Sequence, residues 1–365
     1  MPRKIFILLI DGGDPQYFEH AEVPNLRRIG ASGFWVTGSC VIPSVTNVNN
    51  ASVMTASFPC EHGITGNFWY NPATGHGTYM ESADFLARET LFQRAKRLGM
   101  STALLTSKVK LKKLLERDAD IVVAGEDPPA ALVAKVGPRC EIYSLEINLW
   151  VLEAARVVMQ EQDPDLVYVS TTDYIMHKFP PEHEMARRHL QGLDQIIGRI
   201  ADEQPQREIY ITADHGMSPK HRAINLTAKL AKVGIETVFV PVIKDKYVVH
   251  HDNLGGVGYV YLKDPASVGE AIEVLQEIVG VERVYRCEEA AEQFGLMPDR
   301  IGDLFVLGAP EVVFGDIEGD EQRIDIRSHG SHHEAAIPII GSVAKSPAHE
   351  YRYNLDIARH LRLGE

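Results

Sequence analysis

The sequence has few cysteines and no long apolar run, and each shortage excludes a class of protein. Four cysteines are scattered along 365 residues without a CxxC pair, so we expect free or buried thiols in a reducing compartment rather than a disulfide framework. No apolar segment is long enough to span a bilayer. We find no internal repeat and no low-complexity stretch. The expected organisation is one large domain, or a domain with an insertion.

Positive charge is also in short supply. Lys and Arg together number 37 against 50 Asp and Glu, which gives a net charge of −13. This balance provides no basic field that would match a phosphate backbone, so nucleic-acid polymers and anionic membranes are not expected partners. An anionic substrate must therefore be small and held by a local positive site, and a metal ion would supply one.

The N-terminal segment MPRKIFILLIDGG has basic residues before an apolar run, as a signal peptide does. The run is short, lacks a small-residue cleavage site and ends in Asp11-Gly12-Gly13. We therefore interpret Lys4 to Ile10 as a buried strand, because a continuous β-branched and aliphatic run is typical of a central parallel strand. These features together predict a cytoplasmic protein.

Apolar strands and helices alternate along most of the chain, which predicts an α/β fold with a doubly wound, mostly parallel sheet. The expected strands cover residues 4–10, 34–41, 100–106, 121–124, 166–170, 208–212 and 335–340, and the expected helices cover residues 25–33, 85–98, 145–162 and 191–201. Open α/β sheets bind ligands beyond the carboxyl ends of their strands, so functional side chains are expected there.

Residues 225–307 interrupt this alternation and indicate a small α+β unit with antiparallel strands. Its expected elements are strands at 246–251, 257–262 and 303–307 and a helix at 267–279. The sequence therefore predicts a catalytic core made of residues 1–224 and 308–365, with residues 225–307 inserted as a cap over the edge of the sheet.

Three aspartates and three histidines fall at or just after predicted strand ends. They are Asp11 after strand 4–10, Asp173 and His177 one helical turn apart after strand 166–170, Asp214 and His215 after strand 208–212, and His329 before strand 335–340. Carboxylate oxygen and imidazole nitrogen, without thiolate, suit zinc or another first-row divalent ion. Six such groups are too many for one tetrahedral ion and match a pair of ions acting at phosphorus.

A candidate nucleophile lies between Val41 and Asn67, in the segment VIPSVTNVNNASVMTASFPCEHGITGN. Thr46 stands just ahead of a predicted helix, where free backbone N–H groups and the helix dipole favour negative charge. That position suits a hydroxyl that becomes an alkoxide and then carries a phosphoryl group. The alternative interpretation is that Thr46 or Ser44 simply caps the helix.

Four lysines crowd the start of the helix that follows strand 100–106, where cations are unfavourable with respect to the helix dipole. They are Lys108, Lys110, Lys112 and Lys113. Two interpretations remain open from the residues alone. The lysines form a solvated basic face, or those nearest the strand end clamp the anion of a substrate.

In their order and surroundings these residues resemble the alkaline phosphatase superfamily, in its nucleotide pyrophosphatase/phosphodiesterase branch. The shared runs are IPSVTNVNN, HGITGNFWY, TSKVKLKKLL, STTDYIMHKF, ITADHGM, YVVHH, PDRIGD and RSHG. They extend from Asp11 to beyond His329, so the resemblance covers nearly the whole chain. It implies the α/β fold of that superfamily and a site with two zinc ions.

The resemblance also implies a role for each position. The zinc ligands would be Asp11, Thr46, Asp214 and His215 at one ion, and Asp173, His177 and His329 at the other. The residues in contact with the substrate would be Thr46, Asn67, Lys108, Lys110 and His215. Among them, Asn67 would donate a hydrogen bond to a phosphoryl oxygen, and the two lysines would engage a carboxylate.

The implied activity is hydrolysis of the C–P bond of phosphonoacetate to acetate and phosphate, through a phosphothreonine at Thr46. The substrate class is a small anionic phosphonate or phosphate ester. Charge that develops on the leaving acetate carbon would be met by Lys108 and Lys110. A homodimer is compatible with the sequence.

Three alternatives use the same residues differently. A nucleotide pyrophosphatase or phosphodiesterase would keep the metals and stack a base on Phe68, Trp69 or Tyr70. A phosphoglycerate mutase-like enzyme is disfavoured, because that branch uses a serine nucleophile and typically manganese. A non-catalytic metal-binding protein would have the ligands without turnover.

Two histidine pairs receive no role in the chemistry. His250 and His251 fall in the run YVVHH, where they would support a ligand or the fold. The segment Ser331-His332-His333 departs from the family pattern shortly after His329. This departure keeps the expected ligand and alters the expected wall of the pocket beside it.

Overall fold

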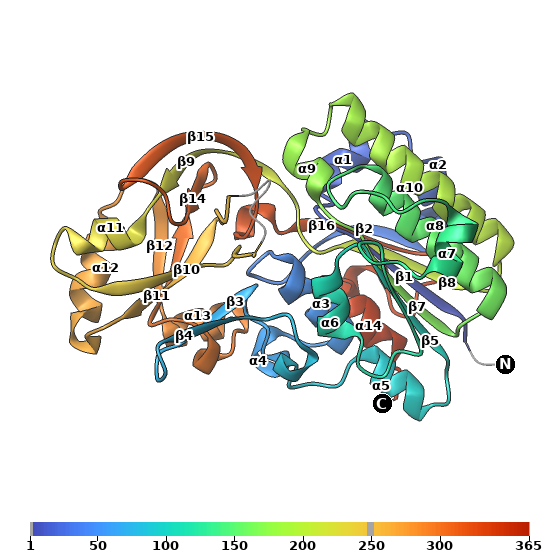
Figure 1. Ribbon diagram of the computed structural model, residues 1–365, viewed down its shortest axis with the longest axis horizontal. Helices are drawn as coiled ribbons and strands as arrows, with labels where there is room; N and C mark the ends of the chain where they lie inside the picture. Colours follow the sequence, from blue (N-terminus) through green and yellow to red (C-terminus); the bar gives the residue numbers. More distant parts are fainter. Residues whose placement is uncertain (1–2, 247–251, 365) are drawn as a thin grey trace.

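The computed structural model describes residues 3–246 and 252–364, and a central sheet organises one half of them (Figure 1). Among these residues the sheet has seven strands, in the order β2-β16-β8-β1-β7-β5-β6. β16 is antiparallel to both neighbours, and the other pairings are parallel. The predicted doubly wound, mostly parallel sheet is confirmed. Its strands are β1 (Ile5–Ile10), β2 (Phe34–Ser39), β5 (Thr102–Thr106), β6 (Ile121–Ala124), β7 (Leu166–Ser170), β8 (Glu208–Ala213) and β16 (Ala336–Gly341).

The central strand β1 explains why the sequence has an unbroken apolar run there. All of its side chains are fully buried. Successive side chains of a strand point to opposite faces of the sheet. The two sets are Ile5, Ile7 and Leu9 in one apolar core, and Phe6, Leu8 and Ile10 in the other. Both faces must therefore be apolar, since helices cover both.

The helices fall into two layers around the central sheet (Figure 1). One face packs against α1 (Pro15–His20), α2 (Pro24–Ser32), α7 (Ala130–Val136), α8 (Glu146–Gln162), α9 (Tyr174–Lys178) and α10 (Glu184–Glu203). The opposite face packs against α3 (Thr46–Thr55), α5 (Leu91–Arg97), α6 (Val109–Leu115) and α14 (Asp356–Leu361), with α4 (Pro59–His62) beside α3.

A second group of elements lies beside the central sheet (Figure 1). Among the described residues, four antiparallel strands pair in the order β10-β11-β13-β12. Three more strands pair in the order β14-β9-β15, where β14 is parallel and β15 is antiparallel to β9. These strands are β9 (Ser218–Ile224), β10 (Thr237–Pro241), β11 (Val257–Leu262), β12 (Val281–Arg286), β13 (Leu304–Gly308), β14 (Val312–Phe314) and β15 (Glu321–Ser328). The helices are α11 (Leu226–Ala231), α12 (Val268–Gln276) and α13 (Cys287–Phe294). The division into a core and a cap of residues 225–307 stays a prediction.

Two local expectations differ from the structure, and a third falls almost wholly outside the described residues. The segment after Asn67, expected as a loop, forms a hairpin of β3 (Phe68–Asn71) and β4 (His76–Tyr79). The helix expected at 85–98 begins only at Leu91, because Thr90 and Gln93 form a capping box that starts it. The expected strand at 246–251 lies outside the described residues except for Lys246.

Short 3₁₀ turns complete the fold, and one of them directly follows the segment of His329. They are η1 (Ala83–Phe85), η2 (Pro265–Ser267), η3 (Pro298–Arg300), η4 (His332–Glu334) and η5 (Ala348–Glu350). In the part of the chain that the structure describes, no helix combines the length and apolar character needed to cross a membrane.

Candidate active site

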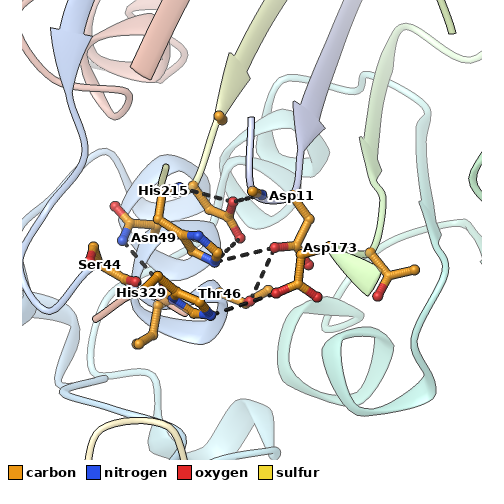
Figure 2. A network of polar contacts seen from close by, with 12 residues as sticks. Asp11, Ser44, Thr46, Asn49, Asp173, His215 and His329 are labelled. Atoms are coloured by element: carbon orange, nitrogen blue, oxygen red, sulfur yellow. Dashed lines mark hydrogen bonds and ion pairs between the residues drawn. The ribbon is translucent and has the colours of Figure 1, made fainter. Parts of the chain in front are cut away.

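The carboxyl ends of β1, β7 and β8 supply most of the candidate site. These strands are neighbours in the sheet, with β1 between the other two. Asp11 directly follows β1, Asp214 directly follows β8, and Asp173 precedes the first turn of α9. Parallel strands end at one edge, so acids that are more than 150 residues apart in sequence meet there. Figure 2 shows the labelled acids and histidines turned toward one another beside Thr46.

Gly12 allows the acids to approach this closely, and the sequence argument did not assign it a role. Its φ of +73° is a conformation that favours glycine, and an added Cβ would lie 3.1 Å from Met176 and 3.2 Å from the Cβ of Asp173. Its backbone N–H donates to Asp214 Oδ1 at 3.1 Å. A glycine after the first strand therefore holds the three carboxylates together.

Thr46 is the first residue of α3, and its side chain does not cap the helix. The residue before the helix is Val45, and no side chain makes a capping hydrogen bond. The Thr46 hydroxyl instead lies 3.4 Å from Asp11 Oδ1. The hydroxyl of Ser44 donates to the Ser331 carbonyl at 2.7 Å and accepts from the Gly330 N–H at 3.0 Å. The capping interpretation is therefore wrong for both residues.

Buried asparagines hold the turn that presents Thr46, and the sequence argument missed their function. Asn49 accepts a hydrogen bond from the Val41 N–H at 2.7 Å and donates back to the Val41 carbonyl at 3.0 Å. Asn50 donates to the Thr46 carbonyl at 3.0 Å and accepts from the hydroxyl of Tyr168 at 2.8 Å. These bonds fix the entry to α3, so the Asn-rich run is a support for the Thr46 position.

The acids and imidazoles form two overlapping groups. Among the described residues, ligand atoms of Asp11, Asp214 and His215 lie within 4.8 Å of one another, and so do those of Asp173, His215 and His329. His177 adjoins the second group, because its Nε2 lies 2.9 Å from Asp173 Oδ2. The rings of His215 and His329 stack with their centroids 3.5 Å apart. All six predicted side chains are buried at one edge of the sheet.

Each of the three imidazoles is oriented by a backbone carbonyl. A carbonyl can only accept, so the ring nitrogen facing it must carry the proton. The pairs are His177 Nδ1 to the Arg327 carbonyl at 2.7 Å, His215 Nδ1 to Gly216 at 2.9 Å and His329 Nδ1 to Ser44 at 2.7 Å. In the neutral ring, Nε2 is then an unprotonated acceptor that faces carboxylate oxygens. Histidine ligands of metals are commonly fixed in this way.

Acceptors that face acceptors need a proton or a cation between them, and the buried atoms that lack a donor show whether the site fits a metal. Asp214 Oδ2 and His215 Nε2 are buried and make no hydrogen bond to the described residues, although they lie 3.5 Å apart. A divalent cation would satisfy both atoms. The donor set of carboxylate oxygen and imidazole nitrogen is therefore consistent with metal binding.

The pKa values of the clustered groups also show that their charges repel or attract one another strongly. Burial and the neighbouring Asp11 raise the pKa of Asp214 well above its ordinary value. Burial would lower the pKa of His215, but Asp214 and Asp11 outweigh it and raise the value to about 9. Burial and the other two rings hold the pKa of His329 well below its usual range. Charge in this cluster is thus costly unless it is compensated.

Lys108 and Lys110 both reach a cavity of about 370 Å³ that Thr46 and Asn67 also line. The ammonium of Lys108 lies 3.0 Å from Asp11 Oδ2 and 3.3 Å from Asp173 Oδ1. These acids outweigh the effect of burial and raise its pKa. The solvated-face interpretation is therefore wrong for Lys108, whose side chain is 13% exposed.

Lys110 has a different partner, which the sequence argument missed. Its ammonium lies 2.7 Å from both oxygens of Asp245. Asp245 also lies 3.5 Å from the amide nitrogen of Asn67. The wall of the cavity beyond them includes Arg139 and Tyr143. These residues belong to segments without a periodic pattern, so only the folded chain shows that they face the site.

The aromatic residues after Asn67 are packing residues. Phe68 packs edge-on against Tyr79, and Trp69 packs edge-on against Phe85. Tyr70 packs against Tyr261. None of the three lines the cavity in the described part of the chain. The basis for stacking a nucleotide base on them is therefore removed.

Of the two remaining histidine pairs, only His332 and His333 belong to the described residues, and they lie apart from this cluster. His250 and His251 are outside the described residues. His332 and His333 lie in η4 at the surface, beside Glu282 of β12. They do not face the cavity that Thr46 lines.

Solved structures with similar folds include two groups of hydrolases. Phosphonoacetate hydrolase from Sinorhizobium meliloti 1021, in complexes with phosphonoformate and with phosphonoacetate, is 31% identical with a TM-score of 0.90. The alignment covers 100% of this chain and 96% of that one. Human ectonucleotide pyrophosphatase / phosphodiesterase 5 is 16% identical with a TM-score of 0.72, over 98% of this chain and 94% of that one. This second likeness shows the fold.

Curated proteins give a shorter match. Venom phosphodiesterase of Naja atra is 22% identical over 227 residues, which are 58% of this chain. The match spans about a quarter of that protein, 26% of its length. A family model described as "Type I phosphodiesterase / nucleotide pyrophosphatase" matches residues 5–332, which include all six clustered acids and histidines and Thr46. The chain therefore belongs to the type I phosphodiesterase / nucleotide pyrophosphatase family, within the alkaline phosphatase superfamily.

Proposed function

We propose that this protein hydrolyses the C–P bond of phosphonoacetate to acetate and phosphate, with Thr46 as the nucleophile. One observation carries the proposal. The carboxylate of Asp11 contacts the Thr46 hydroxyl through one oxygen, at 3.4 Å, and the Lys108 ammonium through the other, at 3.0 Å. The proposed nucleophile and a cation for the leaving group thus contact the two oxygens of one buried carboxylate. The likeness to phosphonoacetate hydrolase over the full chain supports this choice of substrate.

The proposed cofactor is a pair of zinc ions. Asp11, Asp214 and His215 would hold one, with Thr46 at its open position, and Asp173, His177 and His329 would hold the other. When bound, these ions supply the positive charge that favours an ionised threonine oxygen and offsets charge on the phosphoryl group. Oxygen and nitrogen ligands without thiolate support zinc, and two groups of ligands around one hydroxyl support the number of ions.

The first step forms a bond between the Thr46 oxygen and phosphorus and breaks the bond between phosphorus and carbon. The hydroxyl proton of Thr46 is released to water. The electron pair of the broken bond stays on the acetate carbon and delocalises onto the carboxylate as an enediolate. The carbon then takes up one proton from water to give acetate, so the protons balance. The N–H groups at the start of α3 and the side-chain amide of Asn67 would stabilise the phosphoryl oxygens.

Lys108 and Lys110 are the groups that meet the charge of the leaving acetate. A carbon leaving group is poor unless its charge is stabilised as it develops. In the structure, acids already pair with both ammonium groups. The substrate carboxylate must therefore compete with those acids for each lysine. In the second step, water attacks phosphorus, the bond to Thr46 breaks, and phosphate leaves.

The remaining expectations from the sequence are part of the same proposal. Residues 225–307 would act as a cap, because the segment that carries Asp245 enters the cavity from that part of the chain. A cytoplasmic location fits the four scattered cysteines, which are free among the described residues. A homodimer would be compatible with this arrangement.

A panel of substrates with added zinc tests the proposal. We expect turnover of phosphonoacetate to exceed turnover of phosphonopyruvate, a nitrophenyl phosphodiester and ATP. Thr46→Ala should keep its metal content and lose turnover by at least about a thousandfold, because the nucleophile is removed. Substantial residual activity in that variant would remove Thr46 from the role of nucleophile. Faster hydrolysis of the diester than of phosphonoacetate would overturn the substrate assignment.

A further inference from the structure

Three metal-ligating side chains meet at the surface, away from the cavity of Thr46. Glu282 comes from β12, and His332 and His333 come from η4. His333 Nε2 lies 2.7 Å from Glu282 Oε2, and His332 Nε2 lies 3.4 Å from Glu282 Oε1. One ligand atom from each residue lies within 4.8 Å of the others. Residues separated by 50 positions in sequence are thus brought to a single point.

The histidine pair is presented by a rigid turn. The Ser331 hydroxyl accepts from the His333 N–H at 3.2 Å, and Glu334 Oε2 accepts from the Ser331 hydroxyl at 2.8 Å. Glu334 is 1% exposed and forms a buried ion pair with Lys220 at 2.7 Å. Such an anchor fixes the backbone of η4, so little conformational freedom remains to be lost when a ligand binds both rings.

Glu282 is directed to the same point by an irregularity in its strand. The pairing of β12 with β13 shifts between Val281 and Arg283, which leaves Glu282 as the extra residue of a β-bulge. Bulges re-aim a side chain at the edge of a sheet, and β12 is an edge strand of the four-stranded sheet. The local fold on both sides therefore turns a ligand toward the shared point.

A hydrogen bond alone accounts for only part of this arrangement. The 2.7 Å contact between His333 and Glu282 is a good hydrogen bond, but the second ring is turned to the same carboxylate with its centroid 4.0 Å from the first. The Nε2 atoms of both rings face the carboxylate oxygens of Glu282. A neutral imidazole offers a lone pair, which is the form that binds a metal.

We propose that Glu282, His332 and His333 form a divalent-cation site for a zinc-class ion, separate from the candidate active site. Two imidazole nitrogens and one carboxylate are a common ligand set for zinc, and water would complete the coordination because the side chains are 41%, 21% and 37% exposed for His332, His333 and Glu282. The ion fastens β12 to the segment that begins three residues after His329. The site stands independently of the proposed hydrolysis.

The test uses the full chain, first loaded with two equivalents of zinc and then titrated calorimetrically with further Zn²⁺. We expect wild type to bind one more equivalent, and Glu282→Gln, His332→Ala and His333→Ala each to lose it or to weaken it by at least about tenfold. His221→Ala is the matched control, because His221 is also a surface imidazole beside one carboxylate, 3.8 Å from Asp325. This control should titrate as wild type does.

A second readout identifies the ligands directly. Cu²⁺ added to the zinc-loaded protein should give an electron paramagnetic resonance spectrum with two coupled nitrogens, and one nitrogen in each histidine variant. The variants should unfold at the wild-type temperature before the extra cation is added, because the changed side chains are at the surface. The proposal is overturned if wild type binds no additional ion, or if all three variants bind it as tightly as wild type and give the wild-type copper spectrum.

Discussion

Two clusters of carboxylates and imidazoles take histidines from one short segment, residues 329–333, and they differ in burial. His329 belongs to a cluster at the end of a parallel sheet whose members are almost wholly buried. His332 and His333 belong to a cluster at the edge of an antiparallel sheet where every side chain reaches solvent. Both clusters have a ligand set that suits zinc. In the buried cluster the charged groups shift the pKa values of one another strongly. In the exposed cluster, contact with water lowers the cost of charge.

The comparison shows that burial makes a set of metal ligands depend on a bound cation. Backbone carbonyls orient each buried imidazole, and one carboxylate oxygen is left without a hydrogen bond among the described groups. Such a cluster is poorly satisfied without a cation. The exposed cluster already has a hydrogen bond between His333 and Glu282. A cation is therefore needed to satisfy the polar atoms of the buried cluster. At the exposed cluster it would only add a link between β12 and η4.

The largest expected difference between the two clusters comes from changing one carboxylate ligand in each. Asp214→Asn should lower metal content and turnover by more than about a hundredfold, because the neutral amide replaces a charged ligand. Glu282→Gln, the same chemical change in the exposed cluster, should leave turnover unchanged. Metal analysis and steady-state rates measured in parallel on the two variants check this. Equal losses in both would erase the distinction between the clusters.

After chelation, the effect of Asp214→Asn on stability should be neutral or favourable. Burial and Asp11 raise the pKa of the Asp214 carboxyl, so the folded chain resists charge at that position. The amide removes this cost, and Asp214→Asn should be at least as stable as wild type in urea once metal has been removed. A large loss of stability under those conditions would show that the Asp214 carboxylate stabilises the fold itself and does not serve only as a metal ligand.

An intermediate effect is expected at the cavity, where Lys110 of α6 meets Asp245 from the segment that follows β10. Lys110→Ala should lower kcat/KM for phosphonoacetate by roughly 10- to 150-fold, the worth of about 1.5–3 kcal/mol for a hydrogen bond to a charged group. A nitrophenyl phosphate without a carboxylate should be affected much less. Lys112→Ala is the control, because Lys112 belongs to the same helix and does not line the cavity. Equal losses on both substrates would show that Lys110 does not contact a carboxylate.

The smallest effect concerns His62, a buried histidine outside both clusters. Burial lowers the pKa of His62 to about 3, and its ring is fixed by Ser52 at 2.9 Å and by the Ile64 N–H at 3.1 Å. The unfolded ring takes up a proton below about pH 6.5, and the folded ring does so only near pH 3. Its contribution to stability is therefore complete above pH 6.5 and is lost as pH falls.

At pH 5 this loss amounts to about 2 kcal/mol in the free energy of unfolding. Urea unfolding between pH 7 and pH 5 should show a shallower pH dependence for His62→Gln than for wild type, by up to one proton. The same slope in both proteins would show that another group sets the acid sensitivity.

The parts of the site that follow strands could be predicted from the sequence. Asp11, Asp173 and Asp214 each come after a buried strand, and the geometry of parallel sheets brings such positions together. Supports of the site were harder to see. Gly12 and Asn49 act through backbone geometry, which a pattern of residue types does not show.

Contacts between distant segments could not be predicted either. Lys110 pairs with Asp245 across 135 positions of sequence, and Arg139 reaches the cavity from a segment without periodicity. Glu282 meets the histidine pair only because of a bulge in β12. In each case tertiary packing brings together segments that are distant in sequence, and no local propensity encodes the pairing.

The central claim is that Thr46 carries the phosphoryl group. Rapid acid quenching of the zinc-loaded protein during turnover of phosphonoacetate, followed by mass spectrometry of its peptides, tests this most directly. The account predicts a phosphoryl group on the Thr46 residue, absent when Thr46→Ala is treated in the same way. A phosphoryl group on another residue would contradict this claim. So would an unphosphorylated Thr46 in enzyme quenched under conditions in which the reaction intermediate accumulates.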